Sequence, residues 1–591
     1  MFILATFWHF LVTSIWFLLL GYGAANTGTV SGSKRPTLPT YLTAGLAAQT
    51  IIIYLFIYFG VRFSHAWKYS AVALITLSAS QIWRDRSDFS LNRAKQTLLN
   101  INTLLALLAV AGIGILFQRM RGFGIAGILI DTLRNYWLVI DVQAHGLPVN
   151  YPLARERAGA SILVAVIKTI NRMDISEALV LTHFFTAWLT QWILADVARS
   201  FFKKLPHISK WLIAGVSCAV FFSQMSWYPA FHGFLNQTLF TLTYATALAI
   251  LIARQSAPNL LFLLLINCLA FMSYSLSMSV PLIISEVGIL IFYRRSELLS
   301  AIRSYRWVSW AFVVLYLVYL SILVIPSYEF ISIYKNSSPE MATNEGRMNA
   351  GDIRFFTELT DVAGLTYHEN DTENSARKEI RSCSLGGVYL TVLDGIALFI
   401  VLLSMAAFFF IEKRLMSVPL IWLAFMAQFR LIVPYPYAYF KYTSLFSIAM
   451  ILGSAMTVAW LSTKRKQILA FCVMIPLMIG GALQFVRSVD HFSVHGSYLA
   501  PAIPRLSKVY KDLHPICEVN VADSYAPVYW NYWMQEFFPP FSTSATRSKD
   551  HCILMTSDRF ILTIQQNGPS GVLTTDDDWG LFIPRDAIHA H

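Results

Sequence analysis

The segment ILIDTLRNYWLVIDVQAHGLPVNYPLARERAGAS, residues 128–161, is a polar stretch in a chain that is otherwise strongly apolar. The apolar run before it ends near Phe117, and the next one begins near Ala178. Its GLPVNYP portion turns the chain between two short amphipathic pieces, and its charged side chains include Asp131, Arg134, Asp141, Arg155 and Arg157. Such a loop at one surface of a bilayer is typical of a membrane protein that acts on a molecule there.

Composition around this loop predicts a polytopic membrane protein. The chain has 591 residues, of which 56% are hydrophobic and 13% are charged, whereas soluble domains are about 25% charged. The net charge of +12 does not indicate nucleic-acid binding. The bases lie in short clusters at the ends of apolar segments, which is the pattern of the positive-inside rule. We therefore expect membrane lipids, and no nucleic acid, as partners.

Hydropathy predicts about 12–14 transmembrane helices within residues 1–485, because a helix crosses the bilayer with about 20 apolar residues. The clearest candidates are 2–21, 42–63, 98–117, 178–197, 235–252, 307–326, 388–411, 443–461 and 468–485. Shorter or interrupted apolar runs supply the remaining predicted helices. The fold class expected for residues 1–485 is therefore an all-α polytopic membrane domain.

Charge predicts the orientation of this domain. The basic loops are 84–95, 199–210, 294–306, 413–414 and 464–466. Placing them in the cytoplasm exports the loops 118–177 and 329–387, together with residues 486–591. The same alternation places Met1 outside. We expect a multi-pass protein of the plasma (inner) membrane with its active site on the exported face.

Residues 486–591 are predicted to form a small, soluble, mixed α/β domain on the exported side. Strand-like apolar runs alternate there with turn residues. Cys517 and Cys552 flank much of this region. In an exported domain they are expected either to form a disulfide or to remain two free thiols, and spacing alone does not decide between these alternatives.

Several kinds of chemistry lack their usual motifs. The sequence has no Walker-type phosphate loop, no G-x-G-x-x-G followed by an acid, no H-E-x-x-H and no paired C-x-x-C. Neither ATP-coupled transport nor a redox cofactor is therefore expected. Asp394 is nearly the only acid identified well inside a predicted span, whereas ion-coupled transporters keep ionisable residues near the midplane. No metal-ligand set stands out, and a divalent ion bridging a phosphate and an acid stays open.

A loop with both carboxylates and arginines suits sugar transfer from a lipid phosphate. Such a reaction needs a base that takes the proton of the acceptor hydroxyl. It also needs cations that hold the departing phosphate, because negative charge grows on that group as the glycosidic bond breaks. A donor with a lipid tail lies in the bilayer, so this site is expected where helices meet water.

The loop resembles the first exported loop of the C-type (GT-C) membrane glycosyltransferases, and is most similar to their arabinofuranosyltransferase-like branch. That loop has the form D-x-x-R, a G-x-P-x-x-N turn, and R-x-x-G-x-[ST]. The matching positions are Asp131, Leu133, Arg134, Gly146, Pro148, Val149, Asn150, Arg155 or Arg157, Gly159 and Ser161. The resemblance implies a polyprenyl-phosphate sugar donor, inversion at the anomeric carbon and Asp131 as the catalytic base.

Two further segments resemble parts of the same family. FHGFLNQTL, residues 231–239, is similar to S-G-L-E-x-x-L, but it lacks the glutamate and offers His232 and Asn236 instead. PYPYAYFKYTSLF, residues 434–446, resembles the R-Y-x-x-P segment that meets the donor phosphate. Lys441 takes the place of the arginine, with Arg430 nearby, and the following proline is absent.

The predicted substrate-binding residues are Arg134, Asp141, His145, Asn150, Arg155, Arg157, His232, Asn236, Arg430 and Lys441. Each has a structural alternative. Asp131 could cap a helix, Arg134 could pair with it on a helix surface, and the other bases could anchor the chain at lipid headgroups. The histidines could be structural.

The sequence predicts a membrane glycosyltransferase that moves a hexosyl or pentosyl group from a polyprenyl-phosphate donor to a cell-envelope glycan or lipid. One alternative is an O-antigen-type polymerase or ligase, in which the loop 329–387 would carry the essential residues. The other is a lipid or glycan transporter, which would move its substrate without breaking a glycosidic bond.

Overall fold

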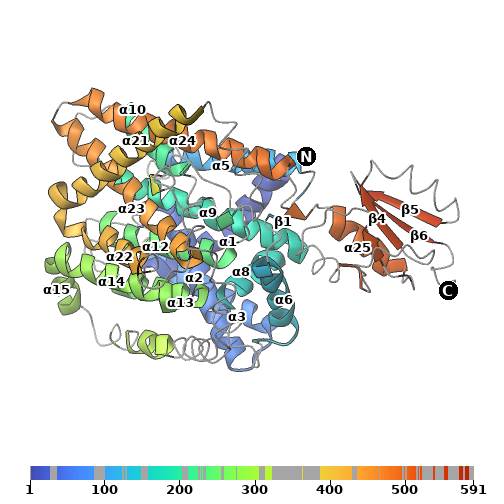
Figure 1. The fold of residues 1–591 in the computed structure, drawn as a ribbon. Helices are drawn as coiled ribbons and strands as arrows, with labels where there is room; N and C mark the ends of the chain where they lie inside the picture. The colour runs from blue at the N-terminus through green and yellow to red at the C-terminus, as the bar shows by residue number, and fades with distance from the viewer. Residues whose placement is uncertain are drawn as a thin grey trace.

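The computed structural model shows a large helical bundle followed by short strands near the C-terminus (Figure 1). It describes residues 2–26, 36–84, 100–120, 122, 125–126, 130–147, 158–202, 210–223, 227, 229–230, 234–253, 259–274, 276–304, 310, 313–321, 362–363, 386–428, 431, 436–464, 466–494, 498–499, 502–513, 517, 519–521, 537–539, 552–556, 571–576 and 579–584. The predicted exported loop 329–387 lies outside these residues, except at 362–363 and 386–387.

The bundle is built from helices, most of which are apolar as predicted. They are α1 (Phe2–Asn26), α2 (Leu38–Tyr58), α3 (Phe63–Arg84), α5 (Ile101–Arg119), α6 (Ile130–Ala144), α8 (Ala158–Asn171), α9 (Ile175–Ser200), α10 (Lys210–Phe221), α12 (Leu235–Leu248), α13 (Leu260–Ser273), α14 (Leu276–Phe292), α15 (Arg295–Ser304), α21 (Gly386–Ala406), α22 (Ser417–Ala427), α23 (Pro436–Thr463) and α24 (Gln467–Val494). Shorter helical turns are Ala249–Ala253, Ala407–Ile411 and Lys413–Leu415.

Six helices in the described part of the chain are long and apolar enough to cross a membrane. They are Phe2–Asn26, Leu38–Tyr58, Ile101–Arg119, Ile175–Ser200, Leu235–Ile252 and Lys441–Thr463. Each overlaps one of the apolar segments predicted above, so the helical and apolar character of the domain is confirmed. The total of 12–14 crossing helices stays a prediction.

The outer surface of the bundle is apolar in helical register. On α1 the exposed side chains Leu4, Trp8, Leu11, Ile15 and Leu19 recur every three or four residues and so form one stripe. The opposite face of this helix, with Phe10 and Phe17, is buried. Large apolar side chains exposed in this pattern require apolar surroundings, which suits a helix with one face on lipid.

Helices α1 and α2 pack with their backbones in close contact. A methyl group added at Gly21 would overlap the carbonyl oxygen of Tyr41, and one added at Gly45 would overlap that of Phe17. Small residues at such crossings let two helices approach closely within a membrane. Glycine is therefore required at both positions because backbone atoms cannot move aside as a side chain can.

Replacing Gly21 with alanine is expected to destabilise the bundle by about 1–3 kcal/mol, the usual cost of overpacking a core. Thermal unfolding of the full chain in detergent measures this effect. Gly395→Ala is the matched control, because nothing lies within 4 Å of a methyl group added at that position on α21. Equal melting temperatures for the two variants would contradict the close α1–α2 contact.

Helix ends gather at two opposite ends of the bundle. At one, called the basic end, Arg199 at the end of α9 donates to Asn100 before α5. Asn259, before α13, also donates to the carbonyl of Ala25 at 3.1 Å near the end of α1. At the other, called the α6 end, the Phe2 amide donates to Gln118 at 3.2 Å. These contacts direct α1 and α9 toward the basic end and α5 and α13 away from it, whereas the side of the membrane that each end faces stays a prediction.

The C-terminal region contains a four-stranded mixed sheet in the order β3-β4-β6-β5. Its strands are β3 (Val519–Val521), β4 (Cys552–Thr556), β5 (Gly571–Asp576) and β6 (Trp579–Pro584), and α25 (Ala502–Leu513) lies beside them. The β3–β4 pair is parallel and the other two pairs are antiparallel. These elements match the secondary structure expected there, while an exported domain over 486–591 stays a prediction.

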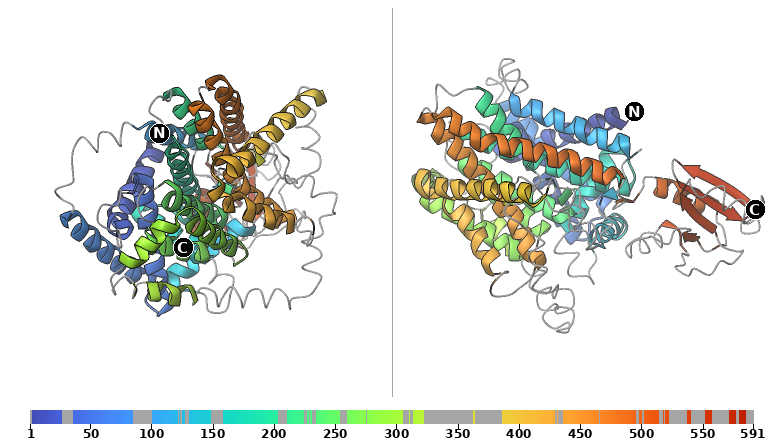
Figure 2. Two further views of the ribbon diagram at one scale, coloured as in Figure 1. Left: turned by 90° about the vertical axis from the view of Figure 1, so that its left-hand side faces the viewer. Right: turned by 45° about the horizontal axis from the view of Figure 1, so that its top comes forward.

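The C-terminal region lies at the α6 end of the bundle. Strand β1 (Ile125–Ala126), just before α6, pairs with β2 (Tyr498–Leu499), just after α24. The rings of Tyr136 on α6 and Phe537 are also 6.0 Å apart. Figure 2 shows α24 running along the bundle to the end at which the sheet lies. The loop 118–177 and the C-terminal region, predicted on the same side, are therefore in direct contact.

Cys517 and Cys552 form a disulfide, which decides between the two predicted alternatives. The bond joins Cys552, the first residue of β4, to Cys517, two residues before β3. Cys552 also pairs with Val519, the first residue of β3. The Tyr510 hydroxyl of α25 donates to the Cys517 carbonyl at 2.9 Å, and burial raises the pKa of that hydroxyl. The disulfide thus links the parallel strands β3 and β4, and α25 is hydrogen-bonded to one of the two bonded residues.

Replacing Cys517 with serine is expected to destabilise the C-terminal region by about 3–4 kcal/mol, because the bond closes a loop of some 35 residues in the unfolded chain. Limited proteolysis of the full chain would show faster cleavage within this region. Cys472→Ser is the control, since Cys472 is an exposed free thiol. Identical protease resistance in both variants would contradict a stabilising disulfide.

Candidate functional site

The predicted catalytic base lies at the start of α6. Asp131 is the second residue of this helix, one position beyond the first helical residue, Ile130. Its predicted alternative role, as a helix cap, stays a prediction. A carboxylate in the first turn is favoured by the helix dipole. Arg134 follows one turn later and is half-buried.

Two predicted binding residues form an exposed pair at the other end of α6. Asp141 and His145 are one helical turn apart, with 4.0 Å between Oδ1 and Nδ1. Their side chains are 46% and 82% exposed, so water screens this pair strongly. The predicted residues Asn150, Arg155, Arg157, His232 and Arg430 lie outside the described residues.

Lys441 is the most distinctive predicted residue that the structure describes. Its side chain is only 6% exposed, although lysine is almost never fully buried. Its ammonium donates to the Tyr274 hydroxyl and lies 4.7 Å from the centre of that ring. The ring centre of Phe234 is 6.0 Å away on another helix. Aromatic faces stabilise a cation held in this way.

Three helix ends meet around Lys441. Phe234 directly precedes α12, Tyr274 directly follows α13, and Lys441 lies in the second turn of α23, which begins at Pro436. Proline fits the first helical position because the amide there has no partner within the helix. The N-terminus of α12 therefore lies at this junction, and the start of α23 lies about one turn before Lys441; helix N-termini carry amides without a partner inside the helix and a partial positive charge.

Polar side chains connect α12 with α23 beside Lys441. The Gln237 amide donates to the Ser444 hydroxyl at 3.0 Å, and this hydroxyl donates to the Lys441 carbonyl at 2.7 Å. At the start of α12, the buried acceptors Asn236 Oδ1 and Gln237 Oε1 have no hydrogen-bond partner among the described residues. Asn236 was predicted from the sequence, and the structure places it two residues from Phe234.

The start of α8, within the predicted loop 118–177, packs against the same junction. Gly159, in the first turn of α8, lies so close to α13 that an added methyl group would be 2.9 Å from Met272. Met272 is two residues before Tyr274, and its sulfur accepts from the Tyr319 hydroxyl at 3.0 Å. The motif that ends with Gly159 and Ser161 therefore adjoins the helix end that binds Lys441.

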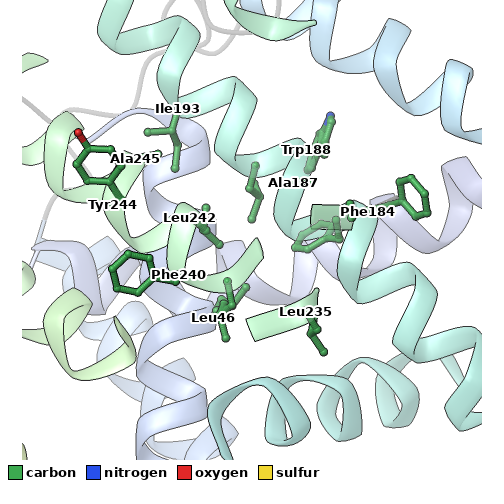
Figure 3. Close-up of a cluster of buried hydrophobic side chains, with 14 of the residues drawn as sticks. Leu46, Phe184, Ala187, Trp188, Ile193, Leu235, Phe240, Leu242, Tyr244 and Ala245 are labelled. Carbon is green, nitrogen blue, oxygen red and sulfur yellow. The ribbon is translucent and has the colours of Figure 1, made fainter. Parts of the chain in front are cut away.

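Apolar packing beneath the site fixes the directions of its helices. Figure 3 shows Leu242 of α12 beside Ala187 of α9; from there α12 continues to Tyr244 on the side toward which α9 continues to Ile193. The two helices thus run parallel, and both begin at the α6 end. Leu242 and Leu235 are fully buried in this cluster. The start of α12, which carries Asn236 and Gln237, rests on a rigid core.

Some members of the site were not predicted. Tyr274 and Gln237 contact Lys441 or its helix, but each is an ordinary polar residue near the end of an apolar run in the sequence. No group of three or more His, Cys, Asp or Glu that could hold a metal ion occurs among the described residues. Comparisons with family models, characterised proteins and solved structures found no match for this chain.

Proposed function

We propose that this protein is an integral membrane glycosyltransferase with a GT-C-like arrangement of 12–14 transmembrane helices. It moves a sugar from a polyprenyl-phosphate donor to a glycan or lipid of the cell envelope, with inversion. The observation that supports this most directly is the buried Lys441 at the junction of the α12 and α23 N-termini. The resemblance of residues 128–161 to this family supplies the second argument.

The junction around Lys441 suits a phosphate that gains charge. A buried ammonium and helix N-termini both favour anions. In a site with little water their attraction is much stronger than at an exposed surface. As the glycosidic bond breaks, its electron pair passes to the phosphate oxygen, and Lys441 stabilises that charge. Asn236 Oδ1 and Gln237 Oε1 are acceptors for hydroxyl groups of the donor sugar.

Asp131 serves as the base in this proposal. The acceptor hydroxyl attacks the anomeric carbon from the face opposite the phosphate, so the new bond forms as the old one breaks. The Asp131 carboxylate takes the proton of that hydroxyl. The contact of Gly159 with α13 supports a common site, because it brings the loop of Asp131 to the helix end at Tyr274.

The site faces the exported side of the plasma (inner) membrane in this proposal. Disulfides persist in oxidising compartments, which favours an exported position for the region that contains the Cys517–Cys552 bond. The pairing of β1 with β2 joins that region to the α6 end. The opposite end carries Arg199 and Lys464, as expected for a cytoplasmic surface.

Mass spectrometry of lipid-linked sugars tests this function. Cells that lack the protein are expected to accumulate a polyprenyl-phosphate sugar, and membranes with the protein to transfer that sugar to an acceptor. Unchanged lipid-linked sugars together with unchanged envelope glycans would refute the proposal. Movement of the lipid without cleavage of the glycosidic bond would indicate a transporter. Activity that depends on loop 329–387 but not on Asp131 would indicate a polymerase or ligase.

A further inference from the structure

An acidic side chain lies in the interior of the bundle, away from the Lys441 site. Helix α14 exposes a stripe formed by Val280, Ile284, Val287 and Ile291, and its other face is buried. Glu286 lies on the buried face and is 3% exposed. The sequence-based view that Asp394 is nearly the only acid well inside a span is therefore incomplete. Glu286 is the single ionisable residue in the apolar run VPLIISEVGILIF.

Glu286 has one polar partner, on the neighbouring helix α13. The Asn267 side-chain amide donates to Glu286 Oε2 at 2.7 Å. Glu286 Oε1 and Asn267 Oδ1 are both buried and have no hydrogen-bond partner in the part of the chain that the structure describes. The pair thus has one hydrogen bond and two acceptors that lack a donor.

No basic side chain lies beside this pair along α14. Glu286 is ten residues after Leu276, about 15 Å along the helix and thus near the middle of a bilayer core. Helix α22 and residues 249–253 pack on α14 without ionisable groups. The other elements packed on α14 contribute Tyr244, Cys268, Arg295, Glu297, Arg303, Lys413 and Arg414.

The bases among these groups lie beyond the end of α14, at the basic end. Arg295, Lys413 and Arg414 are exposed there. They are at least nine residues from Glu286 along the chain, and water screens their charges. Arg294, between α14 and α15, is buried and lies eight residues from Glu286, about 12 Å farther along the helix axis. A carboxylate that is buried without a cation costs several kcal/mol. An additional proton removes both the charge and the shortage of donors.

We propose that Glu286 and Asn267 form a proton-binding site inside the membrane domain. The proton resides on Glu286 Oε1 and is donated to Asn267 Oδ1, while the Asn267 amide donates to Oε2. Both acceptors are then satisfied by a single proton in a two-bond acid–amide pair. This site rests on contacts separate from those of Lys441, so it stands or falls independently of the glycosyltransferase proposal.

Infrared difference spectroscopy of the full-length protein in lipid nanodiscs tests this site. The spectrum of the wild type minus Glu286→Gln is expected to show the C=O band of a protonated carboxyl at neutral pH. In Asn267→Leu this band moves to higher frequency, because the hydrogen bond to its carbonyl is lost. Glu297→Gln, on α15 at the basic end, is the control and leaves the band in place.

Thermal unfolding provides a second measurement. Glutamine can make both hydrogen bonds of the protonated acid, so Glu286→Gln keeps the wild-type melting temperature, whereas Glu286→Leu lowers it by leaving Asn267 unpaired. Carboxylate bands in place of the acid band at neutral pH would overturn the proposal. Stabilisation of the wild type, but not of Glu286→Gln, by sodium or potassium would also overturn it in favour of a cation site.

Discussion

Replacing Asp131 with asparagine is expected to slow sugar transfer by about 10²–10⁴-fold, the usual contribution of a general base. Asparagine keeps the size of the side chain but cannot accept the proton of the acceptor hydroxyl. Binding of the donor is expected to change little, because Asp131 acts on the acceptor. The measurement is transfer from a radiolabelled polyprenyl-phosphate sugar by membranes that contain equal amounts of folded protein.

Asp512→Asn is the control for this experiment. Asp512 is an exposed acid near the end of α25, so its loss removes one carboxylate from the same end of the protein without touching the site. It is expected to retain wild-type transfer. Wild-type transfer by a folded Asp131→Asn variant would remove Asp131 from the mechanism and with it the strongest consequence of the family resemblance.

Replacing Lys441 with methionine is expected to lower transfer by about 10²–10³-fold, the cost of losing one donor to a developing negative charge. Methionine fills a similar volume, so the packing between Phe234 and Tyr274 is retained while the charge is removed. The loss is expected in both kcat and the KM for the donor, because the ammonium holds the phosphate before and during bond breaking.

Two further variants serve as comparisons for Lys441→Met, one away from the site and one within it. Lys464→Met removes a base that directly follows α23, at the basic end, and is expected to keep wild-type activity. Tyr274→Phe removes the hydroxyl that accepts from Lys441 and is expected to cause a smaller loss than Lys441→Met. An active Lys441→Met variant with unchanged KM for the donor would contradict phosphate binding at this lysine.

The apolar helices were predictable because their signal is local. A run of about 20 apolar residues is sufficient to cross a bilayer, whatever the rest of the chain does. The segments 2–21 and 178–197 therefore reappear as α1 and α9, with changed boundaries. The orientation predicted from the basic clusters depends on the membrane itself and stays a prediction.

The sequence by itself determined the helical class, the position of the polar loop and Lys441 as a candidate. Only the tertiary structure decided that Lys441 binds Tyr274, 167 residues earlier in the chain, and that Glu286 binds Asn267. It also paired Cys517 with Cys552. Contacts of this kind depend on which faces of separate helices and strands meet, and hydrophobic periodicity specifies a buried face but not the residue that will oppose it.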